Sequence, residues 1–240
     1  LVLDVKFGRG AFMEDLELAR RLAETMVEIG DLRGTRVVAL LTDMSQPLGR
    51  EVGNASEIRE SIDTLRGEGP DDITELTYAL GAEMLIMGDV AGNSEEARHL
   101  LEQAVSSGSA MAKFAEIITA QGGDAGVLEA PETLPTAFNT DSITAPQSGW
   151  ISRCDALSIG VGAMRLGAGR ERKEDTIDPA VGVTVEAKVG DQVKEGDVLG
   201  QIHWNDAYAR GVATPLITSA WEISDSPVDA PALIVERIGS

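Results

Sequence analysis

The sequence has few residues of the types that build disulfides and metal centres. A single cysteine, Cys154, cannot form an internal disulfide. Only two histidines, His99 and His203, are available, and they lie too far apart in the chain to complete a Cys/His zinc site with it. We therefore expect a protein of a reducing, cytoplasmic compartment. We also expect Cys154 to be packed, His99 to lie on a solvated helix face, and His203 to lie at the surface end of a strand.

Cations and long apolar runs are also scarce. Lys and Arg number 20 against 40 Asp and Glu, so the formal net charge is −20. Such a charge repels phosphate backbones and anionic lipid, which argues against nucleic acid or a membrane as a partner. No apolar run approaches the ~20 residues of a membrane span. With 43% hydrophobic and 25% charged residues, the 240-residue chain has an ordinary globular composition and is long enough for one large domain or two smaller ones.

The chain opens on Leu1-Val2-Leu3-Asp4-Val5, without an initiator Met or the basic segment of a signal peptide. An apolar run broken only by Asp4 is typical of a strand covered on both faces of its sheet. A native N-terminus rarely begins with such a strand. We therefore expect that an N-terminal portion is missing.

Residues 1–136 have the pattern of an α/β domain. Apolar residues between Phe12 and Ile29 recur at helical spacing and are followed by a β-rich run at 36–41, so strand, helix and strand form a βαβ unit with parallel strands. Further helical patterns cover 53–66, 72–87, 94–107 and 110–121. The sequence predicts a mixed sheet with many helices, which is part of an α/β domain.

From residue 137 to 240 the pattern predicts a smaller, β-rich α+β domain. Short Val, Ile and Thr alternations are separated by glycines, and Gly190-Asp191 and Gly196-Asp197 are turn signals. The run 183–188 alternates apolar and polar residues, so one face is expected in a core and the other in water. The segment 231–238 is expected to be a closing strand.

Five separated motifs carry a resemblance to a known family. The segment Asp4-Val-Lys-Phe-Gly-Arg-Gly-Ala-Phe-Met13 resembles a stretch of the thymidine and pyrimidine-nucleoside phosphorylases, as do the motifs at 42–49, 52–55, 166–175 and 177–178. The similarity extends from residue 1 to 238. The chain is identified as a member of this family.

The resemblance implies a pentosyltransferase of nucleoside salvage. Such enzymes carry out reversible phosphorolysis of a pyrimidine nucleoside, with phosphate as co-substrate, to give free base and (deoxy)ribose 1-phosphate. The family also implies no organic cofactor, a cytoplasmic homodimer, and a helical N-terminal domain ahead of the α/β domain and a small C-terminal β domain.

The chain differs from the family in the motifs that bind phosphate and base. The Lys-His-Ser-Thr-Gly-Gly phosphate loop, the base-binding arginine and the Ser-x-x-x-Lys helix of the family do not occur in these 240 residues. Phosphorolysis needs a cationic phosphate cradle and donors that stabilise the departing base. We therefore expect the catalytic residues upstream of Leu1 and predict that this chain alone is inactive. The contacts that distinguish thymidine from uridine are expected in the same absent motifs.

Five retained residues are candidates for substrate binding. The match implies that Phe12 stands at the wall of the pyrimidine pocket; the alternative is an apolar residue that starts a helix and packs on its own sheet. Asp4 and Lys6 point to one face of a strand, where they bind substrate or form a structural ion pair. Gly8 and Gly10 let the backbone approach a ligand, or simply form a tight turn.

The resemblance also implies a monovalent cation site, with K⁺ as the ion. Its ligands match the backbone carbonyls of Leu48 and Glu51 and the carboxylate of Glu60, while the family takes its remaining ligands from the absent upstream segment. Carbonyl and carboxylate oxygens suit a hard cation. The alternative for acids in the first turns of this helix is complementation of the helix dipole.

Three other functions compete with phosphorolysis. The segments 145–150 and 189–199 resemble the paired strands of biotinyl and lipoyl carrier domains, which points to a barrel-sandwich shape, but no lysine is framed at a hairpin tip as a carrier requires. An anthranilate-type phosphoribosyltransferase shares the helical and α/β plan but lacks a domain like 140–240. The third alternative is a non-catalytic structural module.

Overall fold

The protein is described by a computed structural model that covers residues 1–239. The chain forms two compact units. The first contains residues 1–44, 62–129 and 232 onward, and the second contains 45–61 and 130–231. Each unit is therefore assembled from segments that are distant in sequence.

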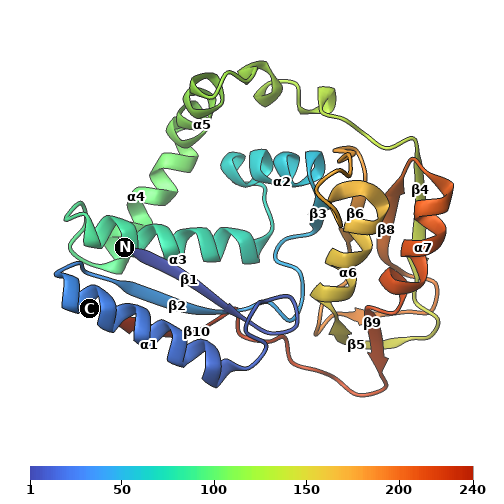
Figure 1. Ribbon diagram of the computed structural model, residues 1–240, viewed down its shortest axis with the longest axis horizontal. Coiled ribbons are helices and arrows are strands. Elements are labelled where there is room, and N and C mark those ends of the chain that lie inside the picture. The colour runs from blue at the N-terminus through green and yellow to red at the C-terminus, as the bar shows by residue number, and fades with distance from the viewer. Residues whose placement is uncertain (240) are drawn as a thin grey trace. The chain divides into compact units, whose positions relative to one another are not determined.

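The first unit is built on a three-stranded sheet with the order β1-β2-β10, in which β1 and β2 are parallel and β10 is antiparallel to β2. One helix lies along one face of this sheet and a second helix lies on the other face (Figure 1). The strands are β1 (Val2–Phe7), β2 (Val38–Asp43) and β10 (Ile234–Gly239), the two covering helices are α1 (Leu16–Arg33) and α3 (Asp71–Met87), and α4 (Ser94–Ser106) and α5 (Ser109–Ala120) follow.

Small residues bring α1 close to the sheet. Ala19 and Ala23 are fully buried there, and a Cβ added at Gly30 would come within 2.3 Å of the Val37 side chain. The predicted start of this helix at Phe12 is wrong: the helix begins at Leu16, because the carboxylate of Asp15 caps it by accepting from Leu18 N. The other predicted helices of this region are confirmed to within two residues at each end.

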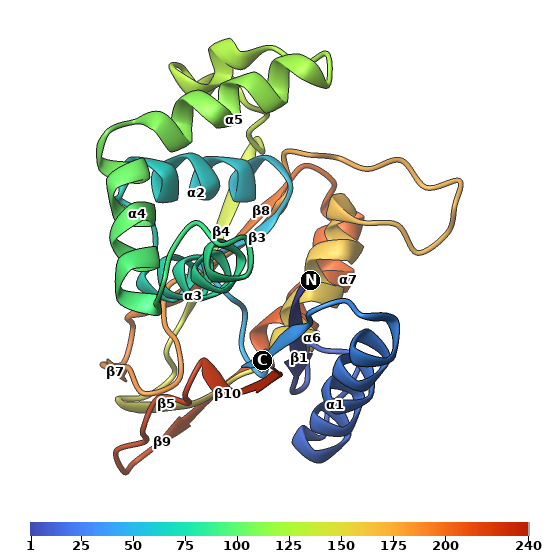
Figure 2. The same ribbon diagram turned by 90° about the vertical axis from the view of Figure 1, so that its left-hand side faces the viewer.

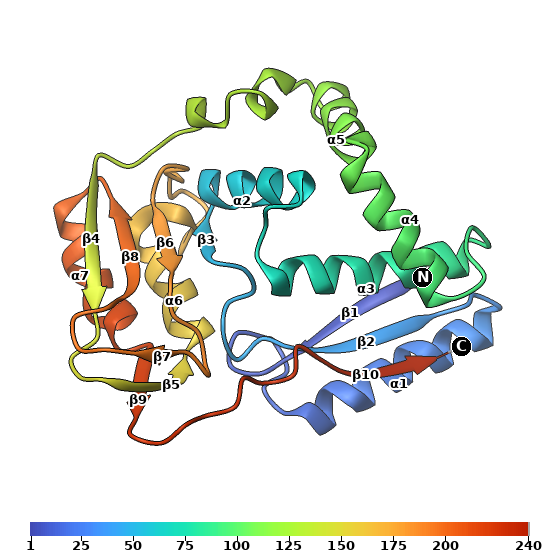
Figure 3. The same ribbon diagram turned by 180° about the vertical axis from the view of Figure 1, so that it is seen from behind.

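The second unit contains two antiparallel sheets, with orders β3-β6-β8-β4 and β7-β5-β9. Figure 3 shows β4, β8, β6 and β3 side by side. The strands are β3 (Glu51–Gly53), β4 (Asn139–Thr144), β5 (Gly149–Cys154), β6 (Gly182–Val185), β7 (Gln192–Val193), β8 (Val198–Trp204) and β9 (Trp221–Ser224), the packed helices are α6 (Ala156–Ala163) and α7 (Ala207–Thr218), and α2 (Ala55–Arg66) begins in this unit.

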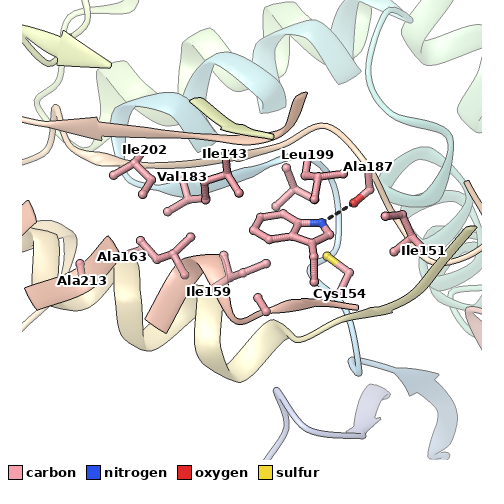
Figure 4. Close-up of a cluster of buried hydrophobic side chains, with 14 of the residues drawn as sticks. Ile143, Ile151, Cys154, Ile159, Ala163, Val183, Ala187, Leu199, Ile202 and Ala213 are labelled. Carbon is pink, nitrogen blue, oxygen red and sulfur yellow. Dashed lines mark hydrogen bonds between the residues drawn. The ribbon is translucent and has the colours of Figure 1, made fainter. Parts of the chain in front are cut away.

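One apolar core fills the second unit between its larger sheet and its helices. Figure 4 shows Val183 and Ile202 of the sheet facing Ile159 and Ala163 of α6, with a dashed bond at Ala187. That bond is donated by the indole N–H of Trp221 at 2.9 Å and satisfies a buried carbonyl. The buried half of the predicted alternation is confirmed, since Val183, Val185 and Ala187 are all buried. The other face is half-buried and not in water as predicted, at Thr184, Glu186 and Lys188.

The two predicted Gly-Asp turns are present and share one construction. Gly190 and Gly196 have φ of 98° and 88°, a region that glycine enters without strain. The carboxylates of Asp191 and Asp197 each accept from the backbone N–H three residues earlier, at 2.8 Å. These bonds fix both turns in the chain.

The compact units differ from the predicted division at residue 137. Residues 45–61 belong to the second unit, because β3 pairs with β6. The strand predicted over 231–238 is present, but it lies in the first unit, where β10 runs along β2 (Figure 3). Strand propensity at both places is a local property, whereas the choice of partner strand is a long-range one.

Candidate functional site

The carboxyl ends of β1 and β2 lie together because the two strands are parallel, and a short loop follows β1. Within this loop Gly10 N donates to Met44 O at 2.9 Å and Gly8 N donates to Met13 O at 3.2 Å. Gly8 has a φ of 102°, so the turn requires glycine. Both glycine N–H groups are thus used to hold the loop, in agreement with a tight turn, and their approach to a ligand stays a prediction.

Asp4 and Lys6 form the ion pair that their spacing suggests. Lys6 Nζ lies 2.7 Å from Asp4 Oδ2, and both side chains are about three-quarters buried. The fully buried Thr42 of β2 donates its hydroxyl to Asp4 and lies 3.5 Å from Lys6 Nζ. The sequence pattern predicts no role for Thr42, because only the β1–β2 register brings it to this pair. A direct contact of Asp4 or Lys6 with substrate remains a prediction.

Phe12 lies in the loop between β1 and α1 and is 95% exposed. The alternative interpretation, an apolar residue that begins the helix and packs on the sheet, is therefore wrong. Asp15 caps the helix instead, which leaves Phe12 outside it. An aromatic ring with this exposure contributes little to the core and is available to a planar ligand.

In the second unit, Glu60 of α2 organises the loop that leads into β3. Its Oε1 atom accepts from Arg50 N at 2.7 Å and from Glu51 N at 3.3 Å. Burial raises the pKa of Glu60, while the bond from Arg50 and the charge of Lys188 act in the opposite direction. Lys188 Nζ itself donates to Pro47 O of the same loop at 2.9 Å. The carboxylate is therefore buried among donors and a nearby cation.

A chain of polar contacts joins Glu51 to His203 across β3, β6 and β8. Thr184 Oγ1 lies 3.0 Å from Glu51 Oε1 and 2.8 Å from His203 Nε2, and His203 Nδ1 lies 3.1 Å from Thr140 Oγ1. Burial raises the pKa of Glu51 and lowers the pKa of His203. His203 is thus half-buried and not the surface residue that was predicted. The network depends on strand register, so no local motif signals it.

The ligands predicted at Leu48, Glu51 and Glu60 could supply only some of the oxygen atoms that a monovalent cation needs. The Glu51 carboxylate accepts from Thr184, which leaves Glu60 as the carboxylate of the set beside backbone carbonyls. Among residues 1–239, no three His, Cys, Asp or Glu side chains form a group that could hold a metal ion. A donor set of one carboxylate and carbonyl oxygens suits a monovalent cation better than a transition metal.

Three of the separated motifs meet inside the second unit. Asn54 Nδ2 donates to Ala168 O at 2.7 Å, and Ala55 N donates to Pro179 O at 3.0 Å. Asp178 N donates to the carbonyl of Gly167, whose φ of 113° requires glycine. The motifs at 52–55, 166–175 and 177–178 therefore form one hydrogen-bonded structure.

The remaining reactive side chains lie apart from these clusters. Cys154 is buried as predicted, and burial raises its pKa to about 12. His99 is exposed on α4, also as predicted, and its Nε2 lies 2.9 Å from Gln103 Nε2. No helix in the described part of the chain is long and apolar enough to cross a membrane.

Comparison with known proteins matches both parts of the chain to family models. A family model described as the α/β domain of a glycosyl transferase family matches residues 1–111, and one described as the pyrimidine nucleoside phosphorylase C-terminal domain matches residues 150–224. The two matches cover the N-terminal α/β part and the β-rich part of the chain with domains of glycosyl transferase and nucleoside phosphorylase families.

Individual relatives agree with these matches. The pyrimidine-nucleoside phosphorylase of Geobacillus stearothermophilus is 47% identical over 238 residues, which is 99% of this chain and 55% of that protein. That of Staphylococcus haemolyticus is 52% identical over 205 residues, 85% of this chain and 47% of that protein. The chain thus spans about half the length of these curated relatives. It belongs to the pyrimidine-nucleoside phosphorylase family.

Proposed function

We propose that this chain serves the reversible phosphorolysis of pyrimidine nucleosides. In that reaction the glycosidic C–N bond breaks, a C–O bond to phosphate forms, and the departing base takes up a proton. The observation that carries the proposal is the identity of 47% over 99% of the chain to a pyrimidine-nucleoside phosphorylase. The loop after β1, which belongs to the motif shared with the family, lies at the carboxyl end of parallel strands, where α/β proteins commonly bind ligands.

In this proposal Phe12 contacts the base. Its exposed ring offers stacking area to a planar pyrimidine and nothing to an anion. Lys6 contributes positive charge near the end of β1, where Asp4 and Thr42 fix its position. Gly8 and Gly10 keep the loop narrow, so a substrate can lie against its backbone.

The 240 residues do not contain the phosphate loop or the base-binding cations of the family. We therefore propose that they do not catalyse the reaction alone and that they act together with those motifs. Three finer features follow from the family in the same way: a barrel-sandwich form of the second unit, a homodimeric enzyme, and a K⁺ ion at the carbonyls of Leu48 and Glu51 and the carboxylate of Glu60.

A chimera tests the proposal. The matched segment of the Geobacillus stearothermophilus protein is replaced by this chain, and release of base from thymidine or uridine with phosphate is followed by chromatography. We expect turnover by the chimera and none by the chain alone. A chimera that is folded by circular dichroism but inactive would contradict the proposed function. Turnover by the chain alone would contradict the proposal that the 240 residues need the phosphate-binding and base-binding motifs of the family.

A further inference from the structure

The loop between β1 and α1, residues 8–13, is fastened to Met44 at the end of β2. We call this segment the β1 loop. Met44 N donates to Phe7 O at 2.7 Å, and Met44 O accepts from Gly10 N at 2.9 Å. The loop leads from β1 to α1, which lie side by side in Figure 2. Both backbone polar groups of Met44 are therefore used to hold the segment that carries Phe12.

The three residues that follow Met44 are each held within the second unit. Each of them accepts a hydrogen bond from a distant part of that unit. The bonds run from Ala156 N to Ser45 O at 3.0 Å, from Val189 N to Gln46 Oε1 at 2.9 Å, and from Lys188 Nζ to Pro47 O at 2.9 Å. Because Ser45 follows Met44 in the chain, the position of this segment is passed to the β1 loop through covalent bonds.

Lys188 is the one charged donor of these three bonds. Hydrogen bonds from an ammonium group are stronger than those between neutral groups. Pro47 is buried and has no backbone N–H, so its carbonyl is its only backbone group for hydrogen bonding, and a buried carbonyl without a donor is costly. The side chain of Lys188 is half-buried beside this carbonyl.

A counter-charge holds the other end of the same segment. The Glu60 carboxylate accepts from Arg50 N and Glu51 N, and the charge of Lys188 acts on Glu60 to lower its pKa. The lysine and the carboxylate therefore fix residues 47–51 from both ends. Only a side chain that reaches back from β6 toward residue 47 makes this possible, so no local motif signals it.

We propose that Lys188 is a positioning residue for nucleoside binding, which fixes Pro47 and thereby Met44, the β1 loop and the ring of Phe12. The role of Phe12 rests on the proposed phosphorolysis, whereas the position of the loop rests on the hydrogen bonds alone. Lys188 acts through Pro47 and Met44 and is not itself a catalytic residue.

Hydrogen exchange in the full 240-residue chain, followed by NMR, tests the position of the loop. Lys188→Met keeps a long side chain and removes the charged donor. We expect the amide of Gly10 to exchange about tenfold faster in this variant, because local opening becomes easier. The amide of Leu18, which Asp15 caps in the same unit, should keep its rate.

Three further variants accompany this measurement. Lys194→Met is the matched control, because Lys194 is an exposed lysine of the same unit, and it should leave the Gly10 rate unchanged. Lys188→Arg keeps a charged donor and should exchange more slowly at Gly10 than Lys188→Met does. Lys188→Gln loses only the charge, should give a smaller change in the same direction, and decides the matter if Lys188→Met does not fold.

Kinetics of the active chimera test the consequence for binding. Lys188→Met should raise the KM for nucleoside severalfold and leave the KM for phosphate unchanged, and Lys188→Arg should retain most of the nucleoside affinity. A residue that only stabilises the fold would change neither KM selectively.

Four outcomes would overturn the proposal: unchanged exchange at Gly10, equally faster exchange at Leu18, an equal effect of Lys194→Met, or an unchanged KM for nucleoside. A chimera without any turnover contradicts the proposed function instead, and the exchange rates then still decide whether Lys188 positions the loop.

Discussion

Thr184 Oγ1 lies 2.8 Å from His203 Nε2, which links β6 to β8 outside the backbone hydrogen bonds of the sheet. Burial lowers the pKa of His203 below its ordinary 6.5. Between the two values the unfolded chain binds more protons than the folded chain, so stability rises with pH there and falls as the pH drops below 6.5.

The first prediction concerns this histidine. Unfolding in urea at about pH 5.5 and about pH 7.5 should show lower stability at the lower pH, and His203→Gln should reduce that difference. His99→Gln, on an exposed helix face, is the control and should preserve it. The raised pKa values of Glu51 and Glu60 act with the opposite sign. The folded chain binds more protons at these two carboxyl groups than the unfolded chain, so the stability that they contribute is lost as the pH rises above 4.5. An unchanged difference in His203→Gln would contradict the assignment.

The second prediction concerns the indole bond in the core of the second unit. Trp221→Phe leaves the carbonyl of Ala187 buried without its donor, which should cost about 1 to 3 kcal/mol of unfolding free energy. Tyr208→Phe removes a hydroxyl from a side chain that is 82% exposed and should change stability by less than about 0.5 kcal/mol. Chemical denaturation measures both. Equal effects of the two changes would show that the indole bond contributes nothing.

The third prediction separates binding from folding at Phe12. Because the ring is 95% exposed, Phe12→Ala should alter the stability of the chain by less than about 0.5 kcal/mol. In the active chimera the same change should weaken nucleoside binding by about 1 to 3 kcal/mol, as loss of a stacking partner does. The KM for phosphate should stay constant. Equal losses for nucleoside and phosphate would identify Phe12 as a structural residue instead.

The fourth prediction concerns the cation. If K⁺ binds only the folded chimera, its melting temperature should be higher in potassium chloride than in choline chloride at equal ionic strength. Glu60→Gln should remove this difference. Glu57→Gln, on the same helix, is the control, because the Glu57 carboxylate accepts only from Gly53 N in the hydrogen bonds of this segment. A potassium effect that persists in Glu60→Gln would exclude that carboxylate as a ligand.

Local patterns predicted much of this structure because they encode local geometry. The i, i+2 spacing of Asp4 and Lys6 places them on one strand face, and the ion pair follows from that spacing alone. The run from Val183 to Ala187 likewise predicted which side chains enter the core. Each of these features depends on neighbours within a few residues.

Other features depend on strand register across long stretches of chain. Thr42 reaches Asp4 because β1 and β2 pair in one particular register, and Thr184 lies between Glu51 and His203 because three strands are aligned. The start of helix α1 also differs from the spacing of apolar residues. Phe12 fits the helical spacing, but the cap at Asp15 determines where the helix begins.

The pairing of β10 with β2 has a consequence for synthesis of the chain. As the polypeptide leaves the ribosome, β1, α1 and β2 emerge before β10, the third strand of their sheet, which is encoded about 190 residues after β2 ends. Until then one edge of β2 has no hydrogen-bonding partner strand, and such edges recruit other chains. The nascent first unit should therefore be a substrate for chaperones until β10 has been made, whereas the central segment 130–231 already holds most strands of the second unit.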